Sequence, residues 1–475
     1  MKKILSLALA ACLTLGASAF VGCTDKGPNS SGSKPEPEFD GWNVQNILER
    51  PVEKDDIRIG TYVTFADTTK GWSGKDQLER YYYAGLNFMP MICTLPKAGM
   101  LTEDEKTYIS RDLTSDLWWK KIDEVTEEYN MLYYFSELSG LANDHEPCGR
   151  RESMSVDDAV SDAREIIPQL SSRCVGVHMV DEPGVGSFGE LAKYARRYAA
   201  IMDSNGNKIG LDALVNHIGS YENMKMWVET AGASVGVISY DAYPFSLGGT
   251  ITNVINLGNQ VRQLANSYNM HVQMYPQSCN WINYRMPTLD EIKWHVNCNV
   301  AMGVTQFNYF NYSMYPAEGC TDAIFDIDGT VRHPEILEGL TEFHKELRVV
   351  DANIRLYHYM VNQIYSTKGY YGMTQLPNSW EISGEGIRDL DLIVSLYEPR
   401  ANATETVKYI SITNASYTDD IENREILLGE NSGITALEYL NPVTGKYEAV
   451  EILNGAFNLS LEKSGIAFFR VTGDL

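Results

Sequence analysis

Short apolar runs, rich in β-branched and aromatic residues, alternate with longer segments of helical periodicity between residues 58 and 350. Most of these runs are nearly continuous, which is typical of parallel strands whose outer face is covered by helices. The pattern predicts eight strands, at residues 58–65, 87–93, 130–136, 174–180, 208–216, 234–241, 270–275 and 305–310.

The segments between these runs carry the signals of helix ends. Ser187 with Glu190, and Thr288 with Glu291, have the spacing of a helix N-terminus, and Gly303 stands just before the last apolar run. Eight such strand–helix units match a (β/α)8 TIM barrel, which we place at residues 51–355. A doubly wound open sheet is the alternative, but it rarely needs eight units, and no G-x-G-x-x-G follows the first strand.

After residue 350 the pattern changes to alternating polar and apolar positions. Stretches at 390–397, 407–413, 435–440 and 466–471 are separated by segments rich in turn residues. This is antiparallel β patterning, so we expect a small C-terminal β-sandwich at residues 356–475. We see no separate chemistry in it, and expect it to pack against the barrel.

The first residues have the features of an export signal. Lys2 and Lys3 precede an apolar run from residue 4 to 22, which ends at a cysteine. The sequence Phe20-Val21-Gly22-Cys23 resembles the bacterial lipobox, and this resemblance implies that Cys23 is lipidated. We therefore expect a signal peptide at 1–22, a tether at 23–50, and an exported protein that is lipid-anchored to a bacterial cell membrane. Whether it faces the cell surface or the periplasm stays open.

Composition limits the classes of partner. The 475 residues contain 39 Lys+Arg against 63 Asp+Glu, a formal charge of −24, and no basic stripe that could follow a nucleic-acid backbone. The cysteines beyond Cys23 are widely spaced and the histidines do not cluster. We therefore predict no metal, no cofactor and no nucleic-acid partner, and we assign no disulfide.

Polar side chains gather where the predicted strands end. In such barrels the βα loops at these ends form the active site, and a ring of acids, amides and a phenol suits a polyhydroxylated ligand. Trp72, in the first βα loop, and Trp281, in the seventh, are placed to stack on sugar rings. From the third strand to the eighth, the polar residues at the strand ends are Glu137, Asp181, Glu182, Asn216, His217, Tyr240, Asp241, Gln277 and Asn308.

Asp181-Glu182-Pro183, at the end of the fourth strand, carries the strongest chemical signal. A second carboxylate beside Glu182 should raise its pKa, and a proton held near neutral pH is what a general acid needs. The Glu-Pro turn, the segment Asn308–Tyr312, the export signal and the terminal β-domain together resemble clan-A-type (β/α)8 glycoside hydrolases. The resemblance implies that Glu182 is the acid/base. This chain departs from the family in having Asp181 where Asn is usual, and Gln277 where the nucleophilic Glu ends the seventh strand.

These departures leave several mechanisms open. Asp241 or Glu137 could supply the second carboxylate, with retention if it stands about 5–5.5 Å from Glu182 and inversion at about 6.5–9.5 Å. The Asp181–Glu182 pair also resembles that of N-acetylhexosaminidases, in which the substrate acetamide is the nucleophile. We interpret the chain as hydrolysing O-glycosidic bonds of oligo- or polysaccharides, with Glu182, Asp241 and Asp181 as catalytic residues. A surface glycan-binding protein without catalysis is the rival hypothesis.

Overall fold

The computed structural model describes residues 50–62, 74–90, 115–135, 156–246, 248, 251–314, 316 and 319–475. All of them belong to one compact unit, Gly41–Leu475. In this part of the chain, no helix is long and apolar enough to cross a membrane. The predicted residues Cys23, Trp72 and Glu137, together with the predicted export signal, lie outside the described residues.

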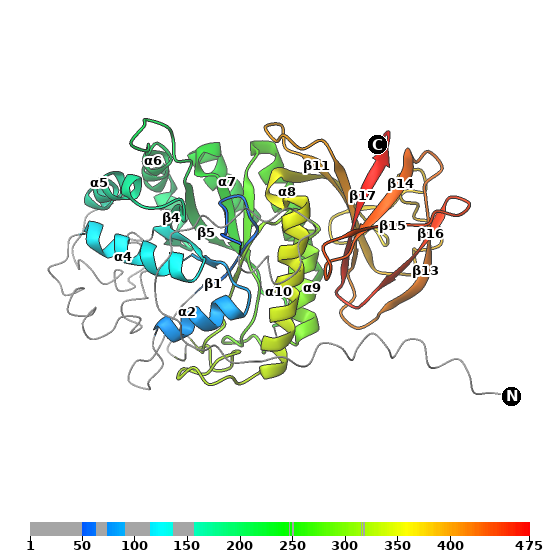
Figure 1. Cartoon of the computed structure of the whole chain (residues 1–475), viewed down its shortest axis with the longest axis horizontal. Helices are drawn as coiled ribbons and strands as arrows, with labels where there is room; N and C mark the ends of the chain where they lie inside the picture. The colour runs from blue at the N-terminus through cyan, green and yellow to red at the C-terminus, as the bar shows by residue number, and fades with distance from the viewer. Residues whose placement is uncertain are drawn as a thin grey trace, which may run out of the picture. The chain divides into compact units, whose positions relative to one another are not determined.

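Eight parallel strands close into a barrel, which confirms the predicted (β/α)8 fold (Figure 1). Each strand pairs with the next along the chain, and β1 closes the circle by pairing with β8 through Gly60 and Asn308. The strands are β1 Arg58–Thr61, β2 Phe88–Met89, β3 Leu132–Phe135, β4 Cys174–Asp181, β5 Asp212–Ile218, β6 Val237–Asp241, β7 His271–Tyr275 and β8 Gln306–Tyr309.

Helices separate these strands and lie around the barrel (Figure 1). The expected capping box at Thr288 and Glu291 is confirmed at the start of α9, and Gly303 takes the positive φ expected after the end of this helix. The longer helices of the described residues are α2 Gly74–Tyr83, α4 Ser115–Glu128, α5 Val156–Ile166, α6 Phe188–Ala199, α7 Tyr221–Ala231, α8 Ile251–Tyr268, α9 Leu289–Val300 and α10 Pro334–Ile354.

Side chains on the barrel strands alternate between two environments. On β5, Ala213 and Val215 face outward and join the core formed with the helices. Leu214, between them, packs instead with Val237 and Val175 of neighbouring strands inside the barrel. Because successive residues of a strand point to opposite faces, this alternation decides which strand-end residues can reach the mouth of the barrel.

A buried ion pair crosses the interior of the barrel. Arg58 on β1 donates to Asp212 on β5 at 2.6 Å, and their side chains are 0% and 5% exposed. The Tyr134 hydroxyl lies 3.0 Å from the same Asp212 oxygen and 2.9 Å from Gln306 Oε1. It also accepts a hydrogen bond from Arg58. Charges are buried in protein interiors when they are paired and hydrogen-bonded, as these are.

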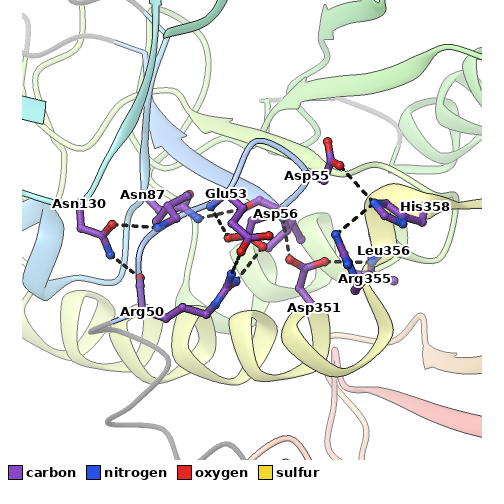
Figure 2. A network of polar contacts seen from close by, with 12 residues as sticks. Arg50, Glu53, Asp55, Asp56, Asn87, Asn130, Asp351, Arg355, Leu356 and His358 are labelled. Atoms are coloured by element: carbon purple, nitrogen blue, oxygen red, sulfur yellow. Dashed lines mark hydrogen bonds and ion pairs between the residues drawn. The ribbon is translucent and has the colours of Figure 1, made fainter. Parts of the chain in front are cut away.

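The segment that leads into β1 is held by polar contacts (Figure 2). Arg50 donates to Asp56 at 2.7 Å, and Asn130 donates to the Arg50 carbonyl at 2.6 Å. Asp351, near the end of α10, accepts from the Ile57 amide at 2.7 Å. These bonds fix the position of the chain directly before β1, which begins at Arg58.

The C-terminal part contains two β-sheets whose strands are antiparallel apart from the β9–β10 pair, as expected for a β-sandwich. Helix α9 packs against it: Trp294 donates to the Ala415 carbonyl, and Asn297 to that of Ser464, both at 2.8 Å. The seven-stranded sheet contains β9 Tyr359–Ser366, β10 Thr374–Gln375, β11 Leu392–Pro399, β12 Lys408–Asn414, β14 Ile434–Leu440, β15 Tyr447–Ala449 and β17 Ile466–Gly473, and the two-stranded sheet contains β13 Ile421–Leu427 and β16 Ala456–Leu461.

Candidate active site

Two predicted catalytic carboxylates meet at the C-terminal mouth of the barrel. Asp181 ends β4, Asp241 ends β6, and Asn216 on β5 stands between them. One amide nitrogen of Asn216 lies 2.9 Å from Asp181 Oδ1 and 3.3 Å from Asp241 Oδ1. Since both oxygens contact the same nitrogen, they lie no more than about 6 Å apart. The structure therefore brings these three sequence-predicted residues together.

Tyr62 completes the surroundings of Asp181. Its hydroxyl donates to Asp181 Oδ2 at 2.5 Å, so that both oxygens of this carboxylate accept a hydrogen bond. The Tyr62 ring packs edge-on against Tyr275, with the ring centroids 5.5 Å apart. Tyr62 is not among the site residues predicted from the sequence. The signal that could have found it is its place two residues after Gly60, on the inward-facing side of the first strand.

Glu182 directly follows β4, at the C-terminal end of the barrel strands. Its φ of +43° lies in the left-handed region that side chains disfavour, and its amide is held by the Asn216 carbonyl at 3.0 Å. Such strained positions concentrate at functional sites. Glu182 is solvent-exposed overall, but neighbouring protein atoms partly shield its carboxyl group from water. This desolvation and the negative charge of Asp181 raise the pKa of Glu182 to about 7.

Asp241 is the most enclosed of the three acids, with 6% of its surface exposed. Burial raises its pKa well above the usual range, and the charges of Glu182 and Asp181 add to this shift. The hydrogen bond from Asn216 opposes the shift without cancelling it. The negative charge of Glu182 therefore opposes ionisation of Asp241, and the two acids are electrostatically coupled.

A layer of polar side chains beneath the acids fixes Asn216. Ser239 donates to Asn216 Oδ1 at 2.9 Å, and Gln273 donates to Ser239 at 3.1 Å. With its oxygen engaged in this way, the Asn216 amide nitrogen must face the two carboxylates. Asn308 lies in the same interior, fully buried against Gly60. The structure thus places Asn308 beneath the mouth and not on its surface, contrary to its predicted substrate contact.

Two further predictions were wrong because strand side chains alternate. His217 follows the inward-facing Asn216 and therefore points outward, with its ring 5.5 Å from Phe188 of α6. Burial lowers its pKa to about 4, so it is a neutral core residue. Tyr240 precedes the inward-facing Asp241, and its hydroxyl donates to Asn299 of α9 at 2.9 Å. Neither side chain reaches the mouth, so neither is a substrate contact.

Gln277 is also not free to bind a substrate. Its amide oxygen accepts from the Phe245 amide at 3.1 Å, and its amide nitrogen donates to the carbonyls of Arg285 and Cys279 at 2.7 and 3.3 Å. The side chain is 1% exposed. It therefore connects the loops that follow β6 and β7, and the predicted role in holding a hydroxyl group is corrected to a structural one.

This geometry predicts the effect of Gln277→Glu. A carboxylate at this position has no N–H group to donate to the carbonyls of Arg285 and Cys279, and it would place negative charge against these two oxygens. We expect the free energy of unfolding to fall by about 1–3 kcal/mol, with no new activity. Urea unfolding should be compared with the matched change Gln263→Glu on the exposed face of α8. A stability loss no larger than that of Gln263→Glu would contradict the structural role.

Aromatic rings form one wall of the mouth. Tyr243 stacks on Phe310 with centroids 5.3 Å apart, and Trp281 stacks on Tyr284 with centroids 6.0 Å apart. Trp281 meets Phe310 edge-on at 5.7 Å, which joins the two pairs. Tyr62 also contacts Phe310, so the wall extends to the residue that holds Asp181. Aromatic faces next to carboxylates offer both surfaces that a sugar needs, one for C–H groups and one for hydroxyls.

Among the described residues, no group of three or more His, Cys, Asp or Glu side chains is arranged to hold a metal ion. The three acids of the mouth are connected instead through Asn216 and through their charges. The chemistry that these residues offer is proton donation and charge stabilisation.

Comparison with known proteins supports this fold. No family model and no curated protein sequence matches the chain. A solved glycoside hydrolase superposes with a TM-score of 0.50 at 14% identity, covering 84% of this chain and 88% of that one. An α-amylase from Geobacillus thermoleovorans, complexed with acarbose, gives a TM-score of 0.48 at 9% identity, covering 89% and 100%. At such identities the likeness shows the fold alone, which is glycoside hydrolase-like.

Proposed function

We propose that the protein hydrolyses O-glycosidic bonds of oligo- or polysaccharides, with Glu182 as the general acid. The observation that carries this proposal is the exposed Glu182, whose carboxyl group has a pKa of about 7, beside the Asp181–Asn216–Asp241 cluster at the C-terminal ends of the barrel strands. Breaking a glycosidic bond requires a proton on the leaving oxygen, and an accessible acid with this pKa can deliver it at neutral pH.

The other acids have distinct proposed roles. Asp181 is held by Tyr62 and Asn216 in one orientation, and its negative charge keeps the proton on Glu182. Asp241 is our preferred second acid. It interacts electrostatically with Glu182, and it ends β6, which is separated from β4 by β5 alone. The assignment of Glu182 as acid/base follows the resemblance to clan-A glycoside hydrolases. In this proposal Asp241 takes the role of the nucleophilic glutamate, because the corresponding position is Gln277, which has no carboxylate.

A substrate-assisted mechanism is less well supported by the same contacts. It would need Asp181 to orient an acetamide group, but both oxygens of Asp181 already accept hydrogen bonds within the protein. Glycan binding without hydrolysis is the second candidate function. It is favoured by one specific observation: Gln277 follows β7, where the resembled glycoside hydrolases carry their nucleophile, and backbone contacts hold its side chain in place.

The pH dependence of hydrolysis tests the role of Glu182. A general acid must be protonated, so we expect kcat/KM to fall as the pH rises through about 7. Asp181→Asn removes the nearby charge that helps to raise this pKa, so the alkaline limb should move to lower pH. The exposed residue Glu222 on α7 gives a control, since Glu222→Gln should leave the limb in place. A limb that does not move in Asp181→Asn would contradict the proposed coupling.

The proposed cellular location rests on the sequence. Cys23 and the residues around it lie outside the described part of the chain, so export and lipid anchoring stay proposals. Incorporation of a labelled fatty acid that disappears in Cys23→Ser would support the anchor.

A further inference from the structure

Two buried thiols lie side by side behind the aromatic wall. Cys279 belongs to the loop after β7 and Cys320 to the segment after β8, and their exposures are 0% and 1%. They pack with Ala323 in one small cluster that also touches Phe310. The two thiol groups are in hydrogen-bonding contact with each other. This proximity is invisible in the sequence, where the two cysteines are widely separated and no disulfide could be assigned.

The backbone holds the two segments together independently of the sulfur atoms. Cys279 and Ala323 form an antiparallel bridge, and the Asn280 amide donates to the Asp322 carbonyl at 2.8 Å. The side-chain oxygen of Asn280 also accepts from the amides of Thr321 and Asp322, at 2.8 and 2.6 Å. A disulfide requires two Cα atoms about 4.4–6.8 Å apart. Two thiols in contact, on segments that the backbone already holds side by side, are close enough to meet this requirement.

We propose that Cys279 and Cys320 are a disulfide-forming pair, oxidised when the chain folds with a disulfide-bearing oxidant such as oxidised glutathione. One cysteine thiolate attacks the oxidant disulfide and forms a mixed disulfide, and the oxidant's other half leaves as a thiolate. The second cysteine then attacks the mixed disulfide. This breaks the mixed S–S bond, displaces the second half of the oxidant as a thiolate and forms one S–S bond in the protein. The two cysteine protons end on the two thiols to which the oxidant is reduced.

Burial explains when this reaction takes place. It raises the pKa of the Cys279 thiol well above its usual range, and the folded chain encloses both sulfur atoms. The attacking thiolate is therefore disfavoured in the finished structure. We infer that the bond forms during folding, before the two segments close over it, and that it is then protected from reduction.

The disulfide would stiffen the aromatic wall. Cys279 Sγ accepts a hydrogen bond at 3.0 Å from the amide of Asn311, the residue after Phe310. Trp281, which meets Phe310 edge-on, is two residues after Cys279 in the chain. A disulfide between Cys279 and Cys320 closes a loop of roughly 40 residues, which reduces the conformational entropy of the unfolded chain. This inference goes beyond the proposed function and does not depend on it, since it concerns only the thiols and the segments that carry them.

The test is a disulfide map of the full-length protein refolded with oxidised glutathione. The protein is denatured, alkylated with iodoacetamide without reduction, digested and analysed by mass spectrometry. We expect a cross-linked peptide pair joining Cys279 to Cys320, lighter than the two separate peptides by two hydrogen atoms. Cys174 and Cys298, which are also buried free thiols, should be alkylated and serve as internal controls. Alkylation of Cys279 and Cys320, or a link from either to another cysteine, would overturn the proposal.

A second measurement follows the consequence of the bond. Wild type refolded with a thiol reductant in place of oxidised glutathione should melt roughly 2–5 °C lower than the oxidised wild type, because the unfolded chain regains freedom. The double variant Cys279→Ala/Cys320→Ala should show no such difference. An equal response of the wild type and the double variant would overturn the inference. If the double variant does not fold, the peptide map of the wild type decides alone.

Discussion

Glu182→Gln is expected to slow hydrolysis of glycosides with poor leaving groups by about 10²–10⁴-fold, since the amide has no proton to donate. Glycosides with strongly acidic phenol leaving groups need little protonation, so their hydrolysis should lose far less. The substitution is isosteric at an exposed position, and it removes the repulsion from Asp181. We therefore expect the melting temperature to stay the same or rise.

The measurement is kcat/KM for a series of aryl glycosides of graded leaving-group pKa. In the wild type the rates should depend weakly on the leaving group, and in Glu182→Gln they should depend on it steeply. Glu222→Gln, on the exposed surface of α7, carries the same chemical change and should behave like the wild type. An equal loss of rate for every leaving group in Glu182→Gln would show that Glu182 is not the proton donor.

The second large effect is expected inside the barrel. Asp212→Asn leaves the fully buried Arg58 guanidinium without its counter-charge, and should lower the free energy of unfolding by about 3–5 kcal/mol. The Tyr134 hydroxyl can still accept from Arg58, but a neutral oxygen cannot balance the charge. Replacing both partners, as in Arg58→Met with Asp212→Leu, should restore much of the loss, because no uncompensated charge is then buried.

Urea unfolding of the single and double variants measures this coupling. The exposed pair of Lys193 and Glu190 on α6, also at 2.6 Å, is the matched control. Glu190→Gln should have little effect on stability, because solvent screens such pairs. A loss for Asp212→Asn no greater than that for Glu190→Gln would contradict the structural importance of the interior ion pair.

Much of the fold is readable from the sequence because parallel strands leave a strong pattern. The predicted strand at 174–180 corresponds to β4 Cys174–Asp181, and that at 270–275 to β7 His271–Tyr275. Both are buried on their two faces, so their composition alone reveals them. In the C-terminal part, β13 Ile421–Leu427 was missed, because most of its residues are polar and only two of them are fully buried.

The site was harder to predict because strand-end residues next to each other point in opposite directions. Sequence analysis placed both Asn216 and His217 at the mouth, but a strand can present only one of them there. The same holds for Tyr240 and Asp241. Tyr62 was missed because the predicted strand at 58–65 placed it within the strand, whereas β1 ends at Thr61 and the Tyr62 hydroxyl reaches Asp181 of β4.

Contacts between distant segments could not be predicted at all. The hydrogen bonds of Gln277 to Phe245 and Arg285, and the meeting of Cys279 with Cys320, depend on how loops from three strands fold over one another. No local pattern encodes them. The sequence already shows that position 277 carries no carboxylate, and the structure adds that the Gln277 amide connects two loops.

The most direct test of the central claim is to compare binding and hydrolysis of the same glycans by the wild type and Glu182→Gln. Calorimetry with the variant identifies oligosaccharides that bind, and the wild type is then assayed for release of reducing ends from those oligosaccharides. We predict that the wild type hydrolyses at least one glycan that Glu182→Gln binds with nearly unchanged affinity but cleaves at least about 100-fold more slowly. If the wild type binds these glycans and releases no reducing ends at any pH from about 5 to 8, hydrolysis is contradicted and glycan binding is the function.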